Sequence, residues 1–318
     1  MKWVTSQGLL IPLSGVKGII YLFFLFAFCV RAQEVDSYEE FKNLKGKVLS
    51  VEENYYTSLE HYRNRTYETA YKTLEVVKRR ITFDEKGRKL TYEEYDTPTH
   101  CMVKTTFLYD KLSRLSGYTE IYDTGELPEK ERDHCWSVVY QYDPMDNDPK
   151  ARKTSALTYQ GNLLKEHRTY TYDSLGQLIE EKISSIRQNQ EKIYASTTHL
   201  IFAYNKEGKL TSLKWAAIPS GDVQYRDVFV YDTQGKISKK EHWWDNTSFI
   251  KYSYEYNEKG DLAIEHKKEG DLLENPKVKC NNSHFYTYKY DEHHNWIEKI
   301  TSDSEGVFLV TQRIIKYY

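Results

Sequence analysis

Large apolar or aromatic residues alternate with polar ones in eight segments of the chain, and each segment ends at an aromatic residue followed by Asp or Asn. Because successive side chains of a β-strand point to opposite faces, this alternation places the aromatic residues on one face. The returning segments, such as residues 238–241, are more polar. The pattern predicts antiparallel hairpins with one aromatic-rich face and one polar face. The eight pairs are Phe83-Asp84, Tyr109-Asp110, Tyr142-Asp143, Tyr172-Asp173, Tyr204-Asn205, Tyr231-Asp232, Tyr256-Asn257 and Tyr290-Asp291.

A glycine follows the Asp or Asn by three residues in five of the eight copies. The acidic or amide side chain can accept a hydrogen bond from a backbone N–H two residues later, and glycine adopts positive φ without a clash. This chemistry predicts a type I turn with a G1 bulge. The glycines are Gly87, Gly176, Gly208, Gly235 and Gly260.

Three copies carry another residue at the glycine position: Ser113, Asp146 and His294. A residue with a side chain held at positive φ costs about 1 kcal/mol. We interpret these copies as drifted repeats with slightly different loops, and a ligand site at the divergent copies is the alternative.

The copies recur at a spacing of roughly 25 to 34 residues, which is typical of a repeat architecture. We therefore predict an all-β fold over residues 47–318. It would be a long antiparallel β-hairpin meander, forming a single sheet that coils or curls because a long open sheet does not stay flat. Repeat arrays of this kind favour a scaffold or binding surface over an enzyme with one pocket.

Residues 1–32 have the features of an export signal peptide. Lys2 and Lys17 supply positive charge before an apolar run at residues 19–28. That run is too short to span a bilayer, so we expect no transmembrane span after cleavage. A short lead-in at residues 33–46 would then precede the repeats.

We expect cleavage near Ala32 and a location in the periplasm, at the cell surface or outside the cell. An uncleaved anchor is one alternative. Lipidation at Cys29 is another, although Phe28 stands where a lipoprotein signal has a small residue.

The charge balance gives no indication of a nucleic-acid partner. The chain has 45 Lys and Arg against 47 Asp and Glu, and the predicted signal peptide contains three of the basic residues and none of the acidic ones. Acidic and basic residues are interspersed along the predicted strands, and no basic patch stands out.

Three cysteines follow the predicted cleavage site: Cys101, Cys135 and Cys280. The pairs His100-Cys101 and His134-Cys135 occupy similar places in neighbouring repeats. However, equivalent strands of neighbouring repeats would lie about 9.6 Å apart, beyond the about 7 Å between Cα atoms that a disulfide tolerates. We expect free or structural cysteines, with a disulfide or a metal site as alternatives, and no cofactor.

No common catalytic motif is present, and we expect no enzymatic activity. Abundant carboxylates leave a carbohydrate-active enzyme, with carboxylates in a sheet groove, as the alternative. The candidate ligand site is Trp243-Trp244, because one of two adjacent rings in a regular strand must face the polar side. Packing of these rings against the next turn is the competing interpretation.

The repeats resemble those of the bacterial YD-repeat, or RHS-like, family. Residues Tyr172–Leu178 match its Tyr-Asp-x-x-Gly-x-Leu pattern at every fixed position, and the resemblance covers about residues 44–318. It implies a coiled β-sheet shell of the kind found in secreted toxins and surface proteins, some of which are described as carbohydrate-binding. It implies no catalytic residue.

These observations predict an exported, non-enzymatic repeat protein that presents a β-sheet surface to carbohydrate or to another cell-envelope protein. The sequence does not predict an oligomeric state. An outer-membrane β-barrel is a further alternative, and the export signal, the strand lengths, the aromatic content and the C-terminal Tyr318 all fit it. However, a membrane barrel needs an apolar face on every strand to contact lipid. Residues 236–241 and 265–269 put charges on both faces, each costing up to about 2–4 kcal/mol near the middle of a bilayer, so we reject the membrane barrel.

Overall fold

The computed structural model describes most of the repeat region in detail. Residues 46–318 form one compact unit, distinct from residues 1–45. The predicted signal peptide at 1–32 lies outside the described residues, and the lead-in at 33–46 is described only in part. The described residues are 41, 44–57, 59–64, 78–97, 99–122, 135–143, 148, 151–189, 192–218, 223–244, 247–271 and 278–318.

The compact unit contains eighteen described strands and one short helix. They are β1 (Val48–Tyr56), α2 (Leu59–Asn64), β2 (Lys78–Phe83), β3 (Lys89–Tyr95), β4 (Cys101–Tyr109), β5 (Leu115–Tyr122), β6 (Cys135–Tyr142), β7 (Lys153–Gln160), β8 (Leu163–Tyr172), β9 (Leu178–Asn189), β10 (Lys192–Tyr204), β11 (Leu210–Ile218), β12 (Val223–Tyr231), β13 (Ile237–Trp244), β14 (Ser248–Tyr256), β15 (Leu262–Asp271), β16 (Val278–Tyr290), β17 (Trp296–Ser302) and β18 (Val307–Tyr317).

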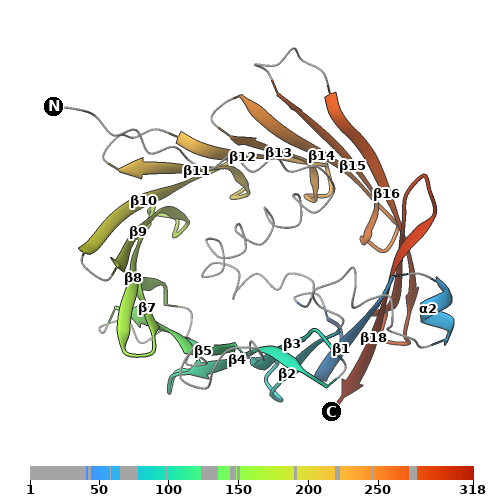
Figure 1. Ribbon diagram of the computed structural model, residues 1–318, viewed down its shortest axis with the longest axis horizontal. Helices are drawn as coiled ribbons and strands as arrows, with labels where there is room; N and C mark the ends of the chain where they lie inside the picture. Colours follow the sequence, from blue (N-terminus) through green and yellow to red (C-terminus); the bar gives the residue numbers. More distant parts are fainter. Residues whose placement is uncertain are drawn as a thin grey trace. The chain divides into compact units, whose positions relative to one another are not determined.

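The strands form one closed antiparallel barrel (Figure 1). Each strand pairs with the next in sequence, and β1 pairs with both β2 and β18, so the first and last strands close the ring. The all-β antiparallel meander is therefore confirmed, whereas the predicted open, coiled sheet is wrong. An open sheet would leave two rows of unpaired backbone groups, and the pairing of β1 with β18 removes both edges.

Side chains alternate between the two faces of the sheet, and residues that lie opposite each other on paired strands belong to the same face. Ile81 lies opposite Tyr92, which lies opposite Thr105, and all three are buried. Leu108 and Val139, on the other face, are exposed. The buried face is the inner one, and α2, which contacts β1 and β18, lies outside the ring in Figure 1.

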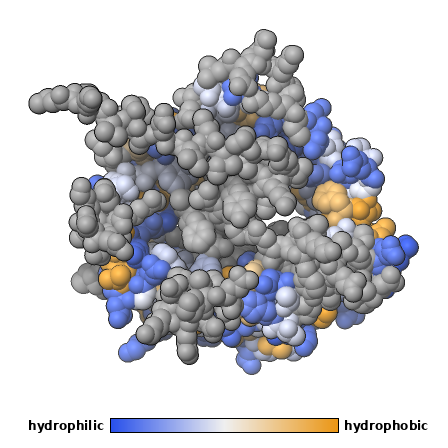
Figure 2. Space-filling view, in the orientation of Figure 1, coloured by the Kyte–Doolittle hydropathy of each residue, from blue (hydrophilic) through white to orange (hydrophobic). Residues whose placement is uncertain are grey.

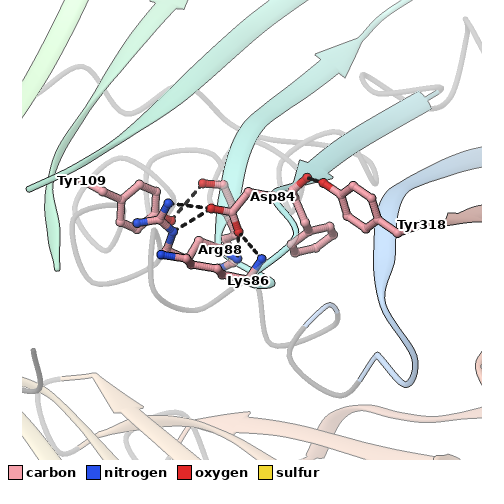
Figure 3. Close-up of polar contacts among 7 residues, drawn as sticks. Asp84, Lys86, Arg88, Tyr109 and Tyr318 are labelled. Atoms are coloured by element: carbon pink, nitrogen blue, oxygen red, sulfur yellow. Dashed lines mark hydrogen bonds and ion pairs between the residues drawn. The ribbon is translucent and has the colours of Figure 1, made fainter. Parts of the chain in front are cut away.

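The repeated turns that the structure describes adopt the predicted geometry and lie at one end of the barrel, because each of them follows an even-numbered strand. Gly87 has φ 77°, and its N–H donates to the carbonyl of Asp84 at 2.9 Å. The Asp84 carboxylate accepts hydrogen bonds from the backbone N–H of Lys86 and of Arg88, at 3.0 and 2.8 Å (Figure 3). A register shift follows in each of these hairpins, as a G1 bulge requires.

The acidic and glycine positions predicted to form these turns are turn residues throughout the described chain. Hydrogen bonds between backbone groups close the turns at Asp110, Asp173, Gly176, Asn205, Gly208, Asp232, Gly235, Asn257, Gly260 and Asp291. Ser113 and His294 hold φ values of 66° and 62°, so the predicted strained positions are confirmed at both. Asp143 directly follows β6, but Asp146 lies outside the described residues.

Two reciprocal substitutions measure the backbone cost of this turn. A Cβ added at Gly87 meets no atom within 4 Å, so Gly87→Ala should lose about 1 kcal/mol of unfolding free energy from positive φ alone. Ser113→Gly should gain stability, by less than this, because glycine also increases the entropy of the unfolded chain. Urea unfolding of both variants checks the pair. A Ser113→Gly protein less stable than the parent would contradict the expected strain.

The tyrosine that stands in seven of the eight copies also links neighbouring repeats. The Tyr109 hydroxyl donates to the carbonyl of Lys89 at 2.9 Å, and its ring lies 4.7 Å from the Arg88 guanidinium (Figure 3). Equivalent hydroxyl-to-carbonyl bonds join Tyr142 to Leu115, Tyr172 to Lys153, Tyr204 to Leu178, Tyr231 to Leu210 and Tyr256 to Ile237. At the closing seam, the Tyr318 hydroxyl donates to the carbonyl of Phe83 at 2.7 Å. The repeated tyrosine is therefore a structural clamp between repeats.

Candidate binding surfaces on the barrel wall

The two tryptophans predicted as one ligand site lie on opposite faces of β13. Trp244 pairs with Tyr225 on β12 and belongs to the inner face, whereas Trp243 pairs with Arg226 and belongs to the outer face. Both side chains are partly exposed. The prediction that adjacent rings face opposite sides is confirmed, and the two tryptophans therefore cannot contribute to the same site.

On the inner face, four ring-bearing side chains form a row that crosses β11, β12 and β13. Trp215 lies directly opposite Tyr225, and their ring centroids are 4.6 Å apart. The His242 ring lies 5.5 Å from that of Tyr225 and 4.2 Å from that of Trp244. We call Trp215, Tyr225, His242 and Trp244 the inner aromatic row.

Polar groups lie directly beside this row. Asp227 is opposite His242 and binds its Nδ1, and the second carboxylate oxygen of Asp227 lies 3.4 Å from Nζ of Lys240. The indole N–H of Trp215 is buried and has no hydrogen-bond partner among the described residues. The inner aromatic row thus combines flat apolar rings with a carboxylate, an ammonium group and an indole donor.

Tyrosines extend the aromatic character of the inner wall along β14 and β16. Burial, followed by the negative charge of Glu265, raises the pKa of Tyr252 to about 12. The same two causes raise the pKa values of Tyr254 and Tyr286 above the ordinary tyrosine value. These phenols therefore remain protonated hydrogen-bond donors at neutral pH.

The inner wall is buried to different degrees in different strands. Inner-face residues of the earlier strands, such as Phe107, Val138 and Ile183, are fully buried. From β11 to β16, no described inner-face residue is fully buried, and Gly270, the one fully buried residue described in these strands, belongs to the outer face. The inner aromatic row lies within this half-exposed part of the wall.

The inner-wall carboxylates in this part of the barrel lie close to basic groups. Glu265 is 3.5 Å from Nδ1 of His284, and Glu269 is 3.4 Å from Nζ of Lys267. Each acid therefore lies beside a nitrogen base, like Asp227 in the inner aromatic row.

The candidate metal and cysteine positions are not brought together. Within the described ranges, no group of three or more His, Cys, Asp or Glu residues could hold a metal ion. Cys101 and Cys135 begin β4 and β6 and carry thiols. His134 and the side chain of Cys280 lie outside the described residues.

Of the helical residues that the structure describes, none belongs to a helix long and apolar enough to cross a membrane.

The fold defines an 18-stranded antiparallel β-barrel protein. No family model and no curated protein matches the chain. A porin-like protein from Bacteroides uniformis ATCC 8492 is 10% identical, with 86% of this chain and 98% of that chain covered and a TM-score of 0.41. A porin-like protein from Bacteroides vulgatus ATCC 8482 is 10% identical, with 70% and 95% covered and a TM-score of 0.38.

The TcdB2-TccC3-TEV structure is similar over 70% of this chain but only 13% of its own length, at 13% identity and a TM-score of 0.33. The same coverage, identity and TM-score hold for the Photorhabdus luminescens Tc holotoxin pore. This chain therefore spans about an eighth of these two neighbours. Likenesses at these TM-scores identify neither a family nor a function.

Sequence reasoning singled out Trp244 but missed its neighbours Trp215, Tyr225, Asp227 and His242. They belong to three different strands, and only the register brings them together. The available signal was period-2 alternation, which places Tyr225 and Asp227 on one face of their strand.

Proposed function

We propose that this protein is an exported, non-enzymatic barrel that binds a carbohydrate through the inner aromatic row. The observation that carries the proposal is the side-by-side placement of Trp215, Tyr225 and Trp244 in the half-exposed part of the inner wall. Aromatic rings of this kind stack on the apolar faces of sugar rings. Asp227 and Lys240 supply an acceptor and a donor for hydroxyl groups.

The outer face carries charged residues that are unfavourable in contact with lipid. Glu52 on β1 lies 3.3 Å from Lys78 and 3.1 Å from Arg80, and Glu93 on β3 lies 3.1 Å from Lys104. Such charges are costly on a lipid-facing wall. Figure 2, which views the barrel from one end, shows mainly hydrophilic residues around the described rim, with apolar residues in separate patches. These features support a barrel that is closed but not embedded in lipid.

Loss of Trp244 is expected to weaken glycan binding by at least tenfold, since tenfold corresponds to about 1.4 kcal/mol of lost contact. A glycan array identifies a ligand, and calorimetry compares the parent protein with Trp244→Ala and Tyr225→Ala. Trp244→Phe keeps an aromatic ring and should retain most of the affinity.

The matched control is Trp243→Ala, because it removes an identical side chain from the next position on the opposite face. It should leave affinity for a neutral glycan unchanged. Absence of any glycan ligand, or equal losses from Trp243→Ala and Trp244→Ala, would argue against the inner aromatic row as the binding site.

A further inference from the structure

A second set of side chains lines up on the outer face of β11–β14. The register places Lys214 opposite Arg226, Arg226 opposite Trp243 and Trp243 opposite Phe249. Gly270 on β15 completes the line, and the Phe249 ring occupies the space beside it: a Cβ on Gly270 would lie 2.6 Å from Cζ of Phe249. Two aromatic rings thus lie next to basic side chains on the outside of the barrel.

The Trp243 ring is held in a defined position. Its Nε1 donates to Glu241 at 3.0 Å, and its centroid lies 5.2 Å from that of Phe249. The Lys251 ammonium lies 4.9 Å from the Trp243 centroid, and the Arg226 guanidinium lies 5.9 Å from it. Cation–π contacts therefore surround an indole that is already hydrogen-bonded.

Like charges face each other on both sides of this aromatic pair. Lys214 lies directly opposite Arg226, and Lys251 lies directly opposite Lys268. Like charges at directly opposite positions of an antiparallel pair destabilise a sheet. The fold therefore carries a local electrostatic cost on the outer face of β11–β15.

Few acidic groups offset these charges. Glu241 pairs with Lys251 at 3.1 Å and also attracts Arg226 at longer range, but no described carboxylate lies within ion-pair distance of Lys214, Arg226 or Lys268. In addition, Nε of Arg226 is buried without a hydrogen-bond partner among the described residues. The basic residues at the outer face of β1–β4 are different, since Glu52 and Glu93 neutralise them.

We propose that the outer basic patch, formed by Lys214, Arg226, Trp243, Phe249, Lys251 and Lys268, binds a carboxylated polysaccharide. This site lies on the opposite face from the inner aromatic row and does not depend on it.

Charge and shape both fit this ligand. The two like-charge pairs are three strand spacings apart, or about 14 Å at about 4.8 Å per strand. The two rings lie in the same row as Lys214 and Arg226, and Lys251 and Lys268 lie two residues further along their strands. A polymer with carboxylates at regular intervals can contact both pairs while its sugar rings stack on Trp243 and Phe249. The sequence also predicts that the chain is exported. An exported protein meets extracellular polysaccharides and is kept apart from the nucleic acids of the cell.

Polygalacturonate is the probe for this proposal, and calorimetry and affinity electrophoresis measure its binding. The double variant Arg226→Gln/Lys268→Gln should reduce affinity at least tenfold, and Trp243→Ala should also reduce it. Lys182→Gln is the matched control, because Lys182 is an exposed lysine on the outer face of β9, outside the patch, and it should leave affinity unchanged. Binding by the parent should weaken as salt is raised, and a neutral glucan should not bind.

The double variant should also be at least as stable as the parent, because it removes one member of each like-charge pair. A loss of binding without a loss of stability separates a ligand site from a structural role. Unchanged polygalacturonate affinity in the double variant would overturn the proposal. So would tighter binding to single-stranded DNA or to phosphatidylglycerol vesicles than to polygalacturonate. Trp244→Ala should bind polygalacturonate normally, so failure of the inner aromatic row and failure of the outer basic patch give different results.

Discussion

Replacement of Arg313 by methionine is expected to destabilise the barrel by about 3–5 kcal/mol. Arg313 on β18 and Glu53 on β1 are both almost fully buried, and Nε of Arg313 lies 2.8 Å from Oε1 of Glu53. The variant would leave the buried Glu53 carboxylate without its ion-pair partner, and with only the more distant charge of Arg79 to offset it, at the seam where the last strand meets the first. Urea unfolding at neutral pH measures the loss.

The pH dependence of this effect follows from the pKa of Glu53. Burial alone would raise that pKa, but the charge of Arg313, with hydrogen bonds from Tyr55 and Arg313, lowers it below the ordinary value of 4.5. A lowered folded-state pKa contributes stability that is complete above the unfolded-state pKa and is lost as pH falls through the folded-state value. The difference between parent and Arg313→Met should therefore be largest at neutral pH and shrink in acid.

The double variant Glu53→Gln/Arg313→Met is the control, because it removes both charges together. It should recover most of the lost stability, as replacement of a whole buried ion pair is often nearly neutral. A double variant as unstable as Arg313→Met would mean that packing, and not the unpaired charge, explains the loss.

The second large effect is expected at Arg168, with Arg168→Met again losing about 3–5 kcal/mol. Arg168 on β8 donates from Nε to Glu166 at 2.5 Å and from a terminal nitrogen to Glu181 on β9 at 2.6 Å. Glu181 has no exposed surface, and its second carboxylate oxygen has no hydrogen-bond partner among the described residues. Loss of the arginine leaves two acids and no cation between them.

The pKa of Glu181 is shifted in the opposite direction from that of Glu53, so the contribution of Glu181 itself to stability is lost as pH rises and not as it falls. Burial, with repulsion by Glu166, raises the pKa of Glu181, although Arg168 acts to lower it. A raised folded-state pKa contributes stability that is complete below the unfolded-state pKa, near 4.5, and is lost as pH rises through the folded-state value. Without Arg168, which acts to lower that pKa, ionised Glu181 costs more free energy, so the loss in Arg168→Met should be smallest in acid and grow as pH rises, as at the seam.

Unfolding curves at several pH values test this expectation. Glu181→Gln in the Arg168→Met background should restore most of the stability at high pH, because it removes the most deeply buried charge. A loss of stability that is the same at every pH would exclude the unpaired Glu181 as its cause.

The seam and the Arg168 cluster show why part of the fold could not be read from the chain. Glu53 and Arg313 are separated by 260 positions, and nothing in either segment indicates that they meet. The prediction of an open sheet failed for the same reason, since closure depends on how strand twist accumulates over eighteen strands. The alternation of apolar and polar residues within one strand does not reveal the summed twist of the whole sheet.

The candidate sites, like the fold, could be predicted from the sequence only in part. Alternation correctly placed Trp243 and Trp244 on opposite faces, but it could not name their neighbours. Lys214, Arg226 and Lys268 are interspersed with acidic residues in the sequence, so no basic patch was expected. The register of five strands brings them together on the outer face.

The sequence by itself determined the turns, the strands and the face of each aromatic residue. These features depend on contacts within a few residues, such as Asp84 with the N–H of Lys86 and positive φ at Gly87. Only the tertiary structure decided that β18 returns to β1, that Tyr318 clamps the turn at Phe83, and that the tryptophans belong to two surfaces with different charges. Those outcomes depend on strand register and on the summed twist of the sheet, which no single repeat encodes.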